Sequence, residues 1–284
     1  MSILCSNPVM HLLAPNPIIN MRYIATFLLA IFIHQVGMTQ DDSVLPTRTA
    51  TAIPESPVAK GKGTSSVKPG INRNFIDPEM SVDEWITRFE VESREVYHSR
   101  REIMEALAIQ PGTRIADVGA GTGFYTALMS EAAGPKGWAY AIEISPQFTQ
   151  HLTTLFAKRV LKNTTTVFCN DHSICLPPNS IDLAFICDVY HHFEYPDQTM
   201  QSIHRALSES GRVIVIDFER IPGTTREWTL GHVRAGKQTF IDEIQKVGFE
   251  LVAERKIAGL KENYFLEFQK LPKDLSKDKP RVHQ

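Results

Sequence analysis

The stretch IADVGAGTGFYTALM, residues 115–129, most constrains the fold of this chain. A hydrophobic run ends in an acid, Asp117, and glycines follow at alternate positions, Gly119, Gly121 and Gly123, before a helical pattern begins. Glycine lets the backbone turn sharply and lets a ligand approach without a Cβ in the way. The stretch therefore predicts a strand, a ligand-binding turn and a helix, with a turn that binds no ligand as the alternative.

Strand-like and helix-like segments alternate along most of the chain. The predicted strands cover residues 114–118, 138–144, 165–169, 180–189, 211–218, 249–257 and 263–269, and the predicted helices cover residues 81–108, 122–133 and 237–247, with two more beginning at Pro146 and Pro196. This alternation predicts a doubly wound α/β fold, in which helices cover both faces of a mostly parallel sheet and a hairpin-like pair of strands closes one edge. Ligands in such folds bind beyond the carboxyl ends of the strands, at the switch point in strand order.

The glycine loop differs from the dinucleotide fingerprint G-x-G-x-x-G, which requires glycine where this chain has Phe124. The acid at the strand end, Asp117, suits a ligand with a cationic amine and is an awkward neighbour for a pyrophosphate. Glu143 ends the next strand, where a carboxylate can accept hydrogen bonds from both ribose hydroxyls. Asp171 follows the third strand and is placed to accept a hydrogen bond from an adenine amino group, unless it only forms an Asx turn.

Together with VYHHFEYP and SGRVIVIDF, these motifs resemble class I S-adenosylmethionine-dependent methyltransferases over about residues 100–270. The resemblance implies a seven-stranded sheet with an antiparallel last strand, and S-adenosyl-L-methionine as the cofactor. It further implies that Asp117 and the glycines hold the methionine end of the cofactor. Glu143 then holds the ribose, and Asp171 with His172 holds the adenine.

The segment CDVYHHFEYP, residues 187–196, follows the fourth predicted strand and is expected to face the transferred methyl group. Methyl transfer to a protonated nucleophile needs proximity, a desolvated cleft and a base. His191 and His192 titrate near neutral pH and are the candidate catalytic residues. The alternative is that this segment shapes the pocket and contacts the cofactor without proton chemistry.

We predict no metal centre. The four cysteines are too few and too irregularly spaced for a disulfide framework or a CxxC zinc site. A soft-metal site at the carboxyl edge of the sheet is the alternative, but its ligand spacing matches no closed site, and small apolar cysteines are common in strands. That alternative involves Cys169, Cys175, Cys187, His172 and His191.

Substrate contacts are expected from two segments outside the core motifs. The helix over residues 81–108 begins with a capping box at Ser81 and is expected to form a lid. Its aromatic residues are expected to wall the substrate and its basic residues to meet an anionic group: Trp85, Phe89 and Tyr97, and Arg94, Arg100 and Arg101. The insertion over residues 222–240 has a basic character that suggests an acidic substrate, carried by His232, Arg234 and Lys237. The alternative for the lid is an amphipathic helix with a solvated charged face.

The two ends of the chain differ in composition from the domain between them. Residues 1–40 form a leader, in which the run MRYIATFLLAIFI, residues 21–33, resembles a signal-peptide core or an anchor. Residues 41–75 are rich in Pro, Ser and Thr and predict a disordered linker. The methyltransferase-like domain is expected over residues 76–270, with a disordered tail over residues 271–284. We expect an exported or membrane-anchored protein, in the periplasm or cell envelope, if the leader acts as a signal, and a cytoplasmic one otherwise.

Three functions are compatible with these motifs. The leading hypothesis is an enzyme that transfers a methyl group from S-adenosyl-L-methionine to a small molecule. The second is a catalytically silent module that binds the cofactor or its product, and the third is a nicotinamide-dependent oxidoreductase, which the missing glycine at Phe124 disfavours. A formal net charge of −2 and scattered basic residues give no reason to expect a nucleic-acid partner, and membrane contact is expected only through the leader.

Overall fold

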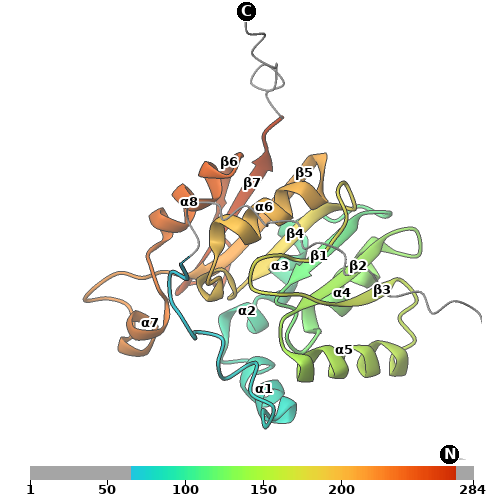
Figure 1. Ribbon diagram of the computed structural model, residues 1–284, viewed down its shortest axis with the longest axis horizontal. Helices are drawn as coiled ribbons and strands as arrows, with labels where there is room; N and C mark the ends of the chain where they lie inside the picture. The colour runs from blue at the N-terminus through green and yellow to red at the C-terminus, as the bar shows by residue number, and fades with distance from the viewer. Residues whose placement is uncertain (1–64, 273–284) are drawn as a thin grey trace, which may run out of the picture. The chain divides into compact units, whose positions relative to one another are not determined.

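Seven strands form one sheet in the order β3-β2-β1-β4-β5-β7-β6 in the computed structural model, which describes residues 65–272 (Figure 1). The strands are β1 (Arg114–Val118), β2 (Trp138–Glu143), β3 (Thr164–Phe168), β4 (Ile181–Cys187), β5 (Leu207–Phe218), β6 (Phe249–Arg255) and β7 (Asn263–Lys270). Strands β1 to β5 pair in parallel, whereas β7 is antiparallel to both β5 and β6. The predicted seven-stranded, mostly parallel sheet with an antiparallel last strand is confirmed.

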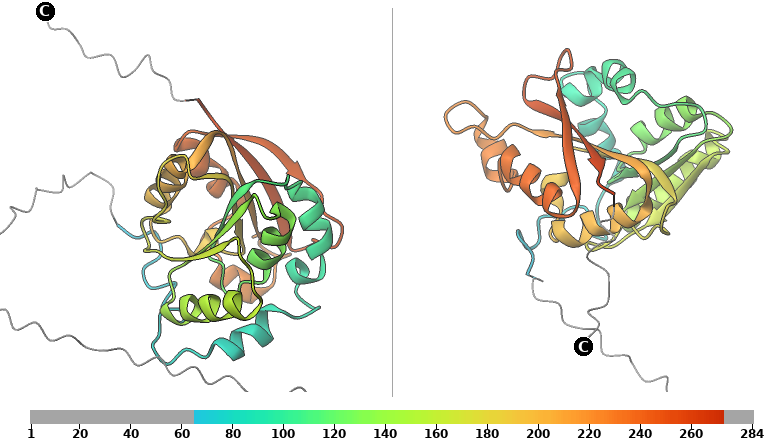
Figure 2. Two further views of the ribbon diagram at one scale, coloured as in Figure 1. Left: turned by 90° about the vertical axis from the view of Figure 1, so that its right-hand side faces the viewer. Right: turned by 90° about the horizontal axis from the view of Figure 1, so that it is seen from above.

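The described helices cover both faces of this sheet (Figure 2). They are α1 (Val82–Phe89), α2 (Glu95–His98), α3 (Arg100–Leu107), α4 (Phe124–Ala133), α5 (Pro146–Lys158), α6 (Pro196–Ala206), α7 (Glu227–His232) and α8 (Lys237–Lys246), with a short 3-10 helix η1 (Tyr190–His192). Successive side chains of a strand point to opposite faces. Ile115 and Phe185 therefore pack with α3 and α4, while their neighbours Ala116 and Ala184 pack with α6 and α8. Two buried cores result, one on each side of the sheet.

The chain order places a switch point between β1 and β4. From β1 the chain proceeds to β2 and β3 on one side, and then crosses to β4 on the other side of β1. Connections that leave the carboxyl ends of β1 and β4 diverge at this point, which opens a crevice there. The loop after Val118 and the loop after Cys187 meet at this crevice, as the sequence predicts for a ligand site.

The lid predicted as one helix over residues 81–108 is three short helices instead. Ser81 does cap α1 by accepting a hydrogen bond from the backbone N–H of Glu84 at 3.4 Å. However, α1 buries no residue, whereas Ile103 and Leu107 of α3 are fully buried in the core. A straight helix of this length would run about 40 Å, so it could not pack on the sheet and also cover the strand ends. The helix is interrupted at residues 90–94, so that one part packs on the sheet and the other covers the strand ends.

The end of the predicted linker packs onto the domain. Ser66 donates its hydroxyl hydrogen to Oε2 of Glu194 at 2.7 Å, and the Asn72 amide donates to the carbonyl oxygen of His192 at 3.1 Å. The ring of Phe75 lies 4.6 Å from that of Trp85. Residues 66–75 therefore belong to the folded domain, and the predicted boundary at residue 76 is corrected. The reason is tertiary, because Ser66 and Asn72 find their partners more than a hundred residues along the chain.

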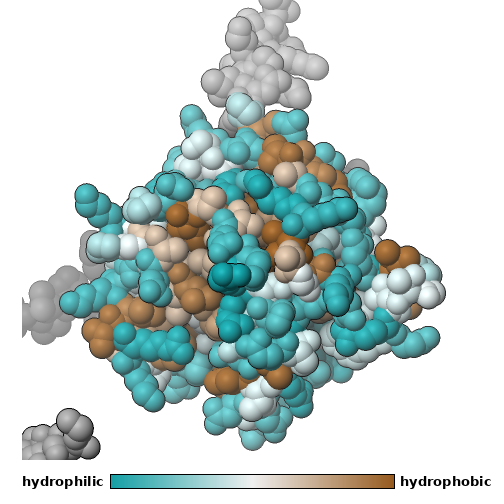
Figure 3. All heavy atoms as spheres, turned by 180° about the vertical axis from the view of Figure 1, so that it is seen from behind, coloured by the Kyte–Doolittle hydropathy of each residue, from teal (hydrophilic) through white to brown (hydrophobic). Residues whose placement is uncertain are grey.

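The rest of the predicted linker, the leader with residues 21–33, and residues 273–284 of the tail lie outside the described residues. Among the helices over residues 65–272, none combines the length and the apolar character needed to cross a bilayer. Seen from behind, the surface carries groups of hydrophobic side chains separated by hydrophilic ones (Figure 3).

Candidate functional site

The glycine loop after β1 is built from left-handed backbone. Gly119, Gly121 and Gly123 have φ angles of 74°, 52° and 80°, a region that other residues rarely adopt. A Cβ on Gly119 would lie 2.6 Å from the side chain of Val189, and a Cβ on Gly123 would lie 2.6 Å from that of Leu152. The first two glycines line the adjoining cavity. Gly123 does not, and its lack of a side chain instead lets α4 approach α5.

A cavity of about 780 Å³ lies beside this loop, in the size range typical of small-molecule sites. Its polar wall includes Asp117, Gly121 and Glu143, from the carboxyl ends of β1 and β2. Its aromatic wall comes from the lid, the start of α4 and the insertion, and includes Phe75, Trp85, Phe89, Tyr97, Phe124 and Trp228. The three aromatic residues predicted to wall the substrate therefore line the cavity. The site is one space with a polar end and an aromatic end.

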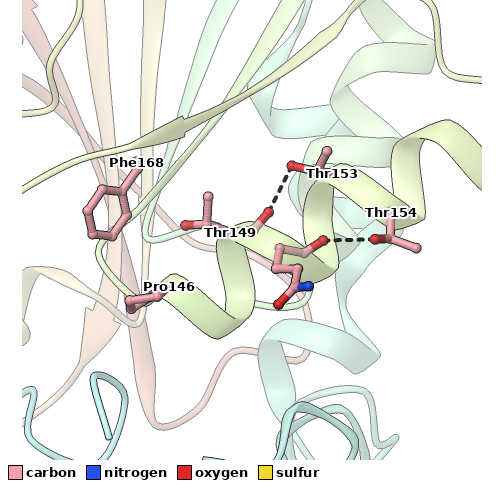
Figure 4. Close-up of a pocket in the computed structure, with 6 residues that line it drawn as sticks. Pro146, Thr149, Thr153, Thr154 and Phe168 are labelled. Carbon is pink, nitrogen blue, oxygen red and sulfur yellow. Dashed lines mark hydrogen bonds between the residues drawn. The ribbon is translucent and has the colours of Figure 1, made fainter. Parts of the chain in front are cut away.

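A second hollow, of about 480 Å³, lies between α5 and the edge strand β3 (Figure 4). Its wall includes the half-exposed ring of Phe168 and several hydroxyl groups of the helix. Thr153 and Thr154 donate these hydroxyl hydrogens to the carbonyl oxygens of Thr149 and Gln150, one turn earlier in the same helix. Figure 4 shows these two hydrogen bonds within α5, and the residues that line the hollow include none of the glycine loop.

Glu143 anchors the glycine loop. Its Oε2 accepts a hydrogen bond from the N–H of Gly121 at 2.9 Å, and its Oε1 accepts from the N–H groups of Ile144 and Ser145 at 2.8 and 2.9 Å. Burial raises the pKa of this carboxyl, and the three N–H donors oppose that shift. A carboxylate offers about four acceptor sites. Glu143 therefore holds the loop and retains acceptor capacity toward the cavity it lines.

Asp117 sits at the bottom of the polar end. Its Oδ2 accepts a hydrogen bond from the hydroxyl of Thr126 at 2.5 Å, which ties the end of β1 to α4. Burial raises the pKa of Asp117 to about 7, and the nearby charge of Glu143 adds to the rise. A cationic ligand group beside Asp117 would favour its charged form. This arrangement suits the amine predicted for that position.

The two residues expected at the adenine do not reach this cavity. Asp171 and His172 hydrogen-bond to each other, and the His172 ring stacks on Tyr195 at 3.9 Å. Neither lines the cavity, whereas Ile144 and Phe148 do. The adenine role of Asp171 and His172 stays a prediction. Ile144 could have been predicted to line the site, because it directly follows Glu143, the acid that ends β2.

The predicted catalytic pair lies in η1 and belongs to a cluster of three histidines on the cavity wall. Nδ1 of His191 donates to Oδ1 of Asp217 at 2.8 Å, and its backbone N–H donates to Oδ2 at 3.1 Å. Nε2 of His192 lies 3.2 Å from Nε2 of His232, which ends α7. Sequence reasoning placed His232 with the substrate insertion and did not join it to this pair.

Burial and mutual repulsion keep two of these rings neutral. Burial, followed by the neighbouring His191, lowers the pKa of His192 to about 2 and that of His232 to about 4. A ring with so low a pKa is a weak base. Of the predicted pair, only His191 has a carboxylate partner among the described residues, Asp217, which orients its ring. A carboxylate orients the catalytic histidine of a hydrolase triad in the same way.

A buried ion pair joins the lid to the cavity floor. Arg94 donates from Nη2 to Oδ2 of Asp188 at 2.5 Å, and the Asn263 amide donates to Oδ1 at 2.7 Å. The guanidinium also lies over the ring of Phe89, 4.6 Å from its centroid. Burial raises the pKa of Asp188, and Arg94 opposes that shift. Arg94 was predicted to meet an anionic substrate, but its partner is this carboxylate of the protein.

Most of the other predicted basic contacts also have acidic partners in the protein. Arg100 and Arg101 pair with Glu92 and Glu102 and do not line the cavity. In the insertion, Arg234 pairs with Glu243, and Lys237 pairs with Glu219 and Glu254. Only His232 of the three insertion residues lines the cavity.

The cysteines of the described domain, Cys169, Cys175 and Cys187, are free thiols. Burial raises the pKa of Cys169 to about 12 and that of Cys187 well above its usual value. A thiol must lose its proton to bind a metal. The cluster of metal-ligating side chains within residues 65–272 consists of histidines alone.

Comparisons with known proteins agree with this geometry. Residues 116–215 match the family model described as a methyltransferase domain. Ubiquinone/menaquinone biosynthesis C-methyltransferase UbiE from Shewanella sp. (strain W3-18-1) is 26% identical over 122 residues, which cover 43% of this chain and 49% of that protein. The chain thus spans about half the length of the curated relatives it matches.

Solved structures match the fold over a longer stretch. A SAM-dependent methyltransferase from Aquifex aeolicus aligns with a TM-score of 0.60 and 19% identity, covering 68% of this chain and all of that one. The [4+2]-cyclase SpnF aligns with a TM-score of 0.53 and 16% identity, covering 61% of this chain and 80% of that one. The glycine loop, the strand order and these matches together support a methyltransferase domain of the class I S-adenosylmethionine-dependent type around residues 116–215, for which S-adenosyl-L-methionine is the implied cofactor.

Proposed function

We propose that the protein transfers a methyl group from S-adenosyl-L-methionine to a small, ring-containing acceptor. One observation carries the proposal: a single cavity joins the glycine loop and its two acids to an aromatic wall. The cofactor supplies a methyl group on a sulfonium sulfur, and the protein's task is to hold the acceptor in line with it in a dry cleft.

The polar end of the cavity fits the cofactor. Gly119 and Gly121 line the cavity with left-handed backbone, and the missing Cβ of Gly119 makes room for Val189 beside it. Glu143 is already oriented by three backbone N–H groups, so it needs no rearrangement to accept from a ribose hydroxyl. Asp117 provides the negative charge for the ammonium group.

The aromatic end favours a flat, largely apolar acceptor over a strongly acidic one. Two further arginines line the cavity, but Arg88 lies 3.6 Å from Glu84 and Arg226 lies 2.5 Å from Glu262, so carboxylates offset their charge. Stacked aromatic walls bind planar rings through their large apolar area. The similarity to UbiE, a ubiquinone/menaquinone biosynthesis C-methyltransferase, agrees with a ring-containing acceptor.

The histidine cluster is the polar feature available to the acceptor's reacting atom. His191 is held by Asp217, which fixes the tautomer with a proton on Nδ1 and leaves Nε2 free. On this proposal, Nε2 of His191 accepts a proton from the acceptor. The neutral ring of His192 lines the cavity beside it.

Calorimetric titration of the purified full chain tests the cofactor first. We expect micromolar binding of S-adenosylmethionine and of its demethylated product, and no binding of NAD. A panel of phenols and quinols, with release of the demethylated product as readout, then tests turnover. Binding without turnover on any acceptor would favour the catalytically silent module, and binding of NAD alone would favour the oxidoreductase.

The affinity for S-adenosylmethionine is expected to rise with pH below neutrality. Because burial raises the pKa of Asp117 to about 7, its carboxyl is largely protonated in the free protein at pH 5.5. The cofactor's ammonium group favours the carboxylate, so binding lowers this pKa and releases a proton. The affinity should increase about 15-fold from pH 5.5 to 7. Calorimetry over this range measures it, and Asp117→Asn should remove the dependence; a flat wild-type profile would rule out the pairing.

A further inference from the structure

Three imidazole rings meet on the part of the cavity wall formed by η1 and the end of α7. One ring nitrogen from each of His191, His192 and His232 lies within 4.8 Å of the other two. All three residues line the cavity. We propose that these histidines bind a divalent transition-metal ion of the zinc class, with an open coordination position toward the cavity.

The spacing of the ring nitrogens suits such an ion. Nε2 of His192 lies 3.2 Å from Nε2 of His232. Two imidazole nitrogens bound to zinc at about 2.0–2.1 Å, with a tetrahedral angle between them, are about 3.3 Å apart. One ring nitrogen of His191 lies within 4.8 Å of a ring nitrogen of each of the other two histidines. Closing that gap takes a side-chain shift of about 1.5 Å on the same geometry.

The ring of His191 already has the partner that metal-bound histidines usually have. Its Nδ1 donates to Oδ1 of Asp217, and that carboxylate is fully buried. Histidine ligands almost always donate their second N–H to a carboxylate, a carbonyl or a water, which fixes the tautomer and the ring orientation. This bond leaves Nε2 of His191 for the ion.

Aromatic neighbours hold the other two rings in place. The indole of Trp228 stacks on His232, with centroids 4.7 Å apart and an angle of 18° between the planes. The ring of Phe75 meets His192 edge-on at 5.2 Å. The imidazoles are therefore positioned by packing, which reduces the entropy that ligand binding would otherwise cost.

A hydrogen bond between His192 and His232 is the competing explanation of their short contact. One proton shared between the two Nε2 atoms accounts for that pair. It does not account for the third ring beside them or for the buried carboxylate of Asp217 behind that ring. A shared ion accounts for all four residues, because three imidazoles with an open position form a donor set that zinc prefers.

The charges around the cluster indicate what would occupy the open position. Lys68 adds a positive charge beside the cluster, where its Nζ donates to the carbonyl oxygen of His232 at 2.6 Å. The carboxylate of Asp188 is offset by Arg94. A divalent ion would therefore carry uncompensated positive charge, which an ionised oxygen or sulfur of the bound molecule would neutralise. On the proposed function, that atom is the methyl acceptor, and His191 then serves as a ligand and not as a base.

Equilibrium dialysis of the full chain tests the site, after a chelator has removed bound metal. Zn²⁺ content is measured by elemental analysis, and S-adenosylmethionine binding is measured in parallel. We expect one Zn²⁺ per chain. His232→Ala should weaken Zn²⁺ binding by more than about 100-fold, because changes in outer partners alone cost about 10–100-fold. His98→Ala is the matched control, because the His98 side chain is exposed and pairs with Glu92.

A second readout works on the wild-type protein. Co²⁺ is paramagnetic, so its binding beside Trp228 should quench part of the tryptophan emission, and Trp228→Phe should remove that part while Co²⁺ is still bound. Equal Zn²⁺ binding by His232→Ala and His98→Ala would overturn the proposal. So would absence of Zn²⁺ binding in wild-type protein that binds S-adenosylmethionine. If His232→Ala does not fold, the Co²⁺ experiment still decides, because a lack of Trp228-dependent quenching in the wild-type protein overturns the proposed metal site.

The two proposals fail separately. Zn²⁺ binding that depends on His232, in a protein that does not bind S-adenosylmethionine, would support the metal site and remove the proposed methyl transfer. Binding of S-adenosylmethionine by a chain that takes up no Zn²⁺ would remove the metal site and leave the proposed methyl transfer standing.

Discussion

Glu143→Ala is expected to weaken S-adenosylmethionine binding by at least about 100-fold, which corresponds to about 2.7 kcal/mol. The substitution removes the predicted acceptor for the ribose. It also removes the partner of three backbone N–H groups, those of Gly121, Ile144 and Ser145. Hydrogen bonds to a charged group contribute about 1.5–3 kcal/mol each. The glycine loop therefore loses its anchor at the same time as the ligand loses its contact.

Calorimetry measures this affinity, and thermal unfolding shows whether the variant is folded. Because the cavity admits water to the freed N–H groups, we expect the free energy of unfolding to fall by only about 2–3 kcal/mol. Glu143→Gln should be intermediate, since its amide oxygen still accepts hydrogen bonds while its NH₂ group cannot. Glu131→Ala, an exposed acid on α4, is the matched control and should bind normally. Wild-type affinity in a folded Glu143→Ala protein would show that the ribose binds elsewhere.

Arg94→Ala is expected to lower the free energy of unfolding by about 3–5 kcal/mol at neutral pH, the usual effect of removing one partner of a buried ion pair. Asp188 is almost fully buried and keeps only the Asn263 amide as a partner once Arg94 is gone. The stacking of the guanidinium on Phe89 is lost as well. The lid should detach from the cavity floor, so methyl transfer should fall with stability.

The pH dependence of this variant identifies the cause. Burial raises the pKa of Asp188 even beside Arg94, and loss of Arg94 raises it further. A carboxyl whose pKa is raised in the folded state destabilises the fold as pH rises through that pKa. The free energy of unfolding of the variant should therefore fall least at acidic pH and most at a pH above the pKa of Asp188. Chemical denaturation across a pH series measures this difference.

A second substitution separates charge from packing. The double variant Arg94→Ala with Asp188→Asn should regain most of the lost stability, because asparagine removes the buried charge and tolerates the φ of 53° found at this position. Arg101→Ala is the control, since Arg101 and Glu102 form an exposed pair that contributes little. If the double variant is no more stable than Arg94→Ala, the buried charge is not the cause.

Local chemistry explains why much of the fold was predictable. The alternation of apolar runs with helical patterns predicted each strand of the sheet to within a few residues. The central strands bury both faces and so appear as nearly continuous apolar runs, whereas the edge strands β3 and β6 stay partly exposed. Ser145 and Pro146 predicted the start of α5, since the cap is formed by neighbours in sequence: Ser145 accepts from the N–H of Phe148 at 3.3 Å. Asp117 and Glu143 lie at the site for the same reason, as residues at the carboxyl ends of adjacent parallel strands.

Contacts between distant segments were beyond such reasoning. Arg94 and Asp188 are 94 residues apart, and His192 and His232 are 40 residues apart, so no local pattern could pair them. The break in the predicted lid helix and the docking of residues 66–75 have the same origin, because both depend on surfaces that exist only once the sheet has formed.

The strand–helix alternation and the glycine loop could be predicted from local sequence, because they depend on backbone conformation and on neighbouring residues, and the family resemblance implied the cofactor. Tertiary structure alone decided which acids meet which bases, that Asp171 lies away from the cavity, and that three histidines share one wall. The physical reason is that charge pairing and ligand geometry depend on distances of a few ångströms between segments, and packing sets those distances only after the chain has folded.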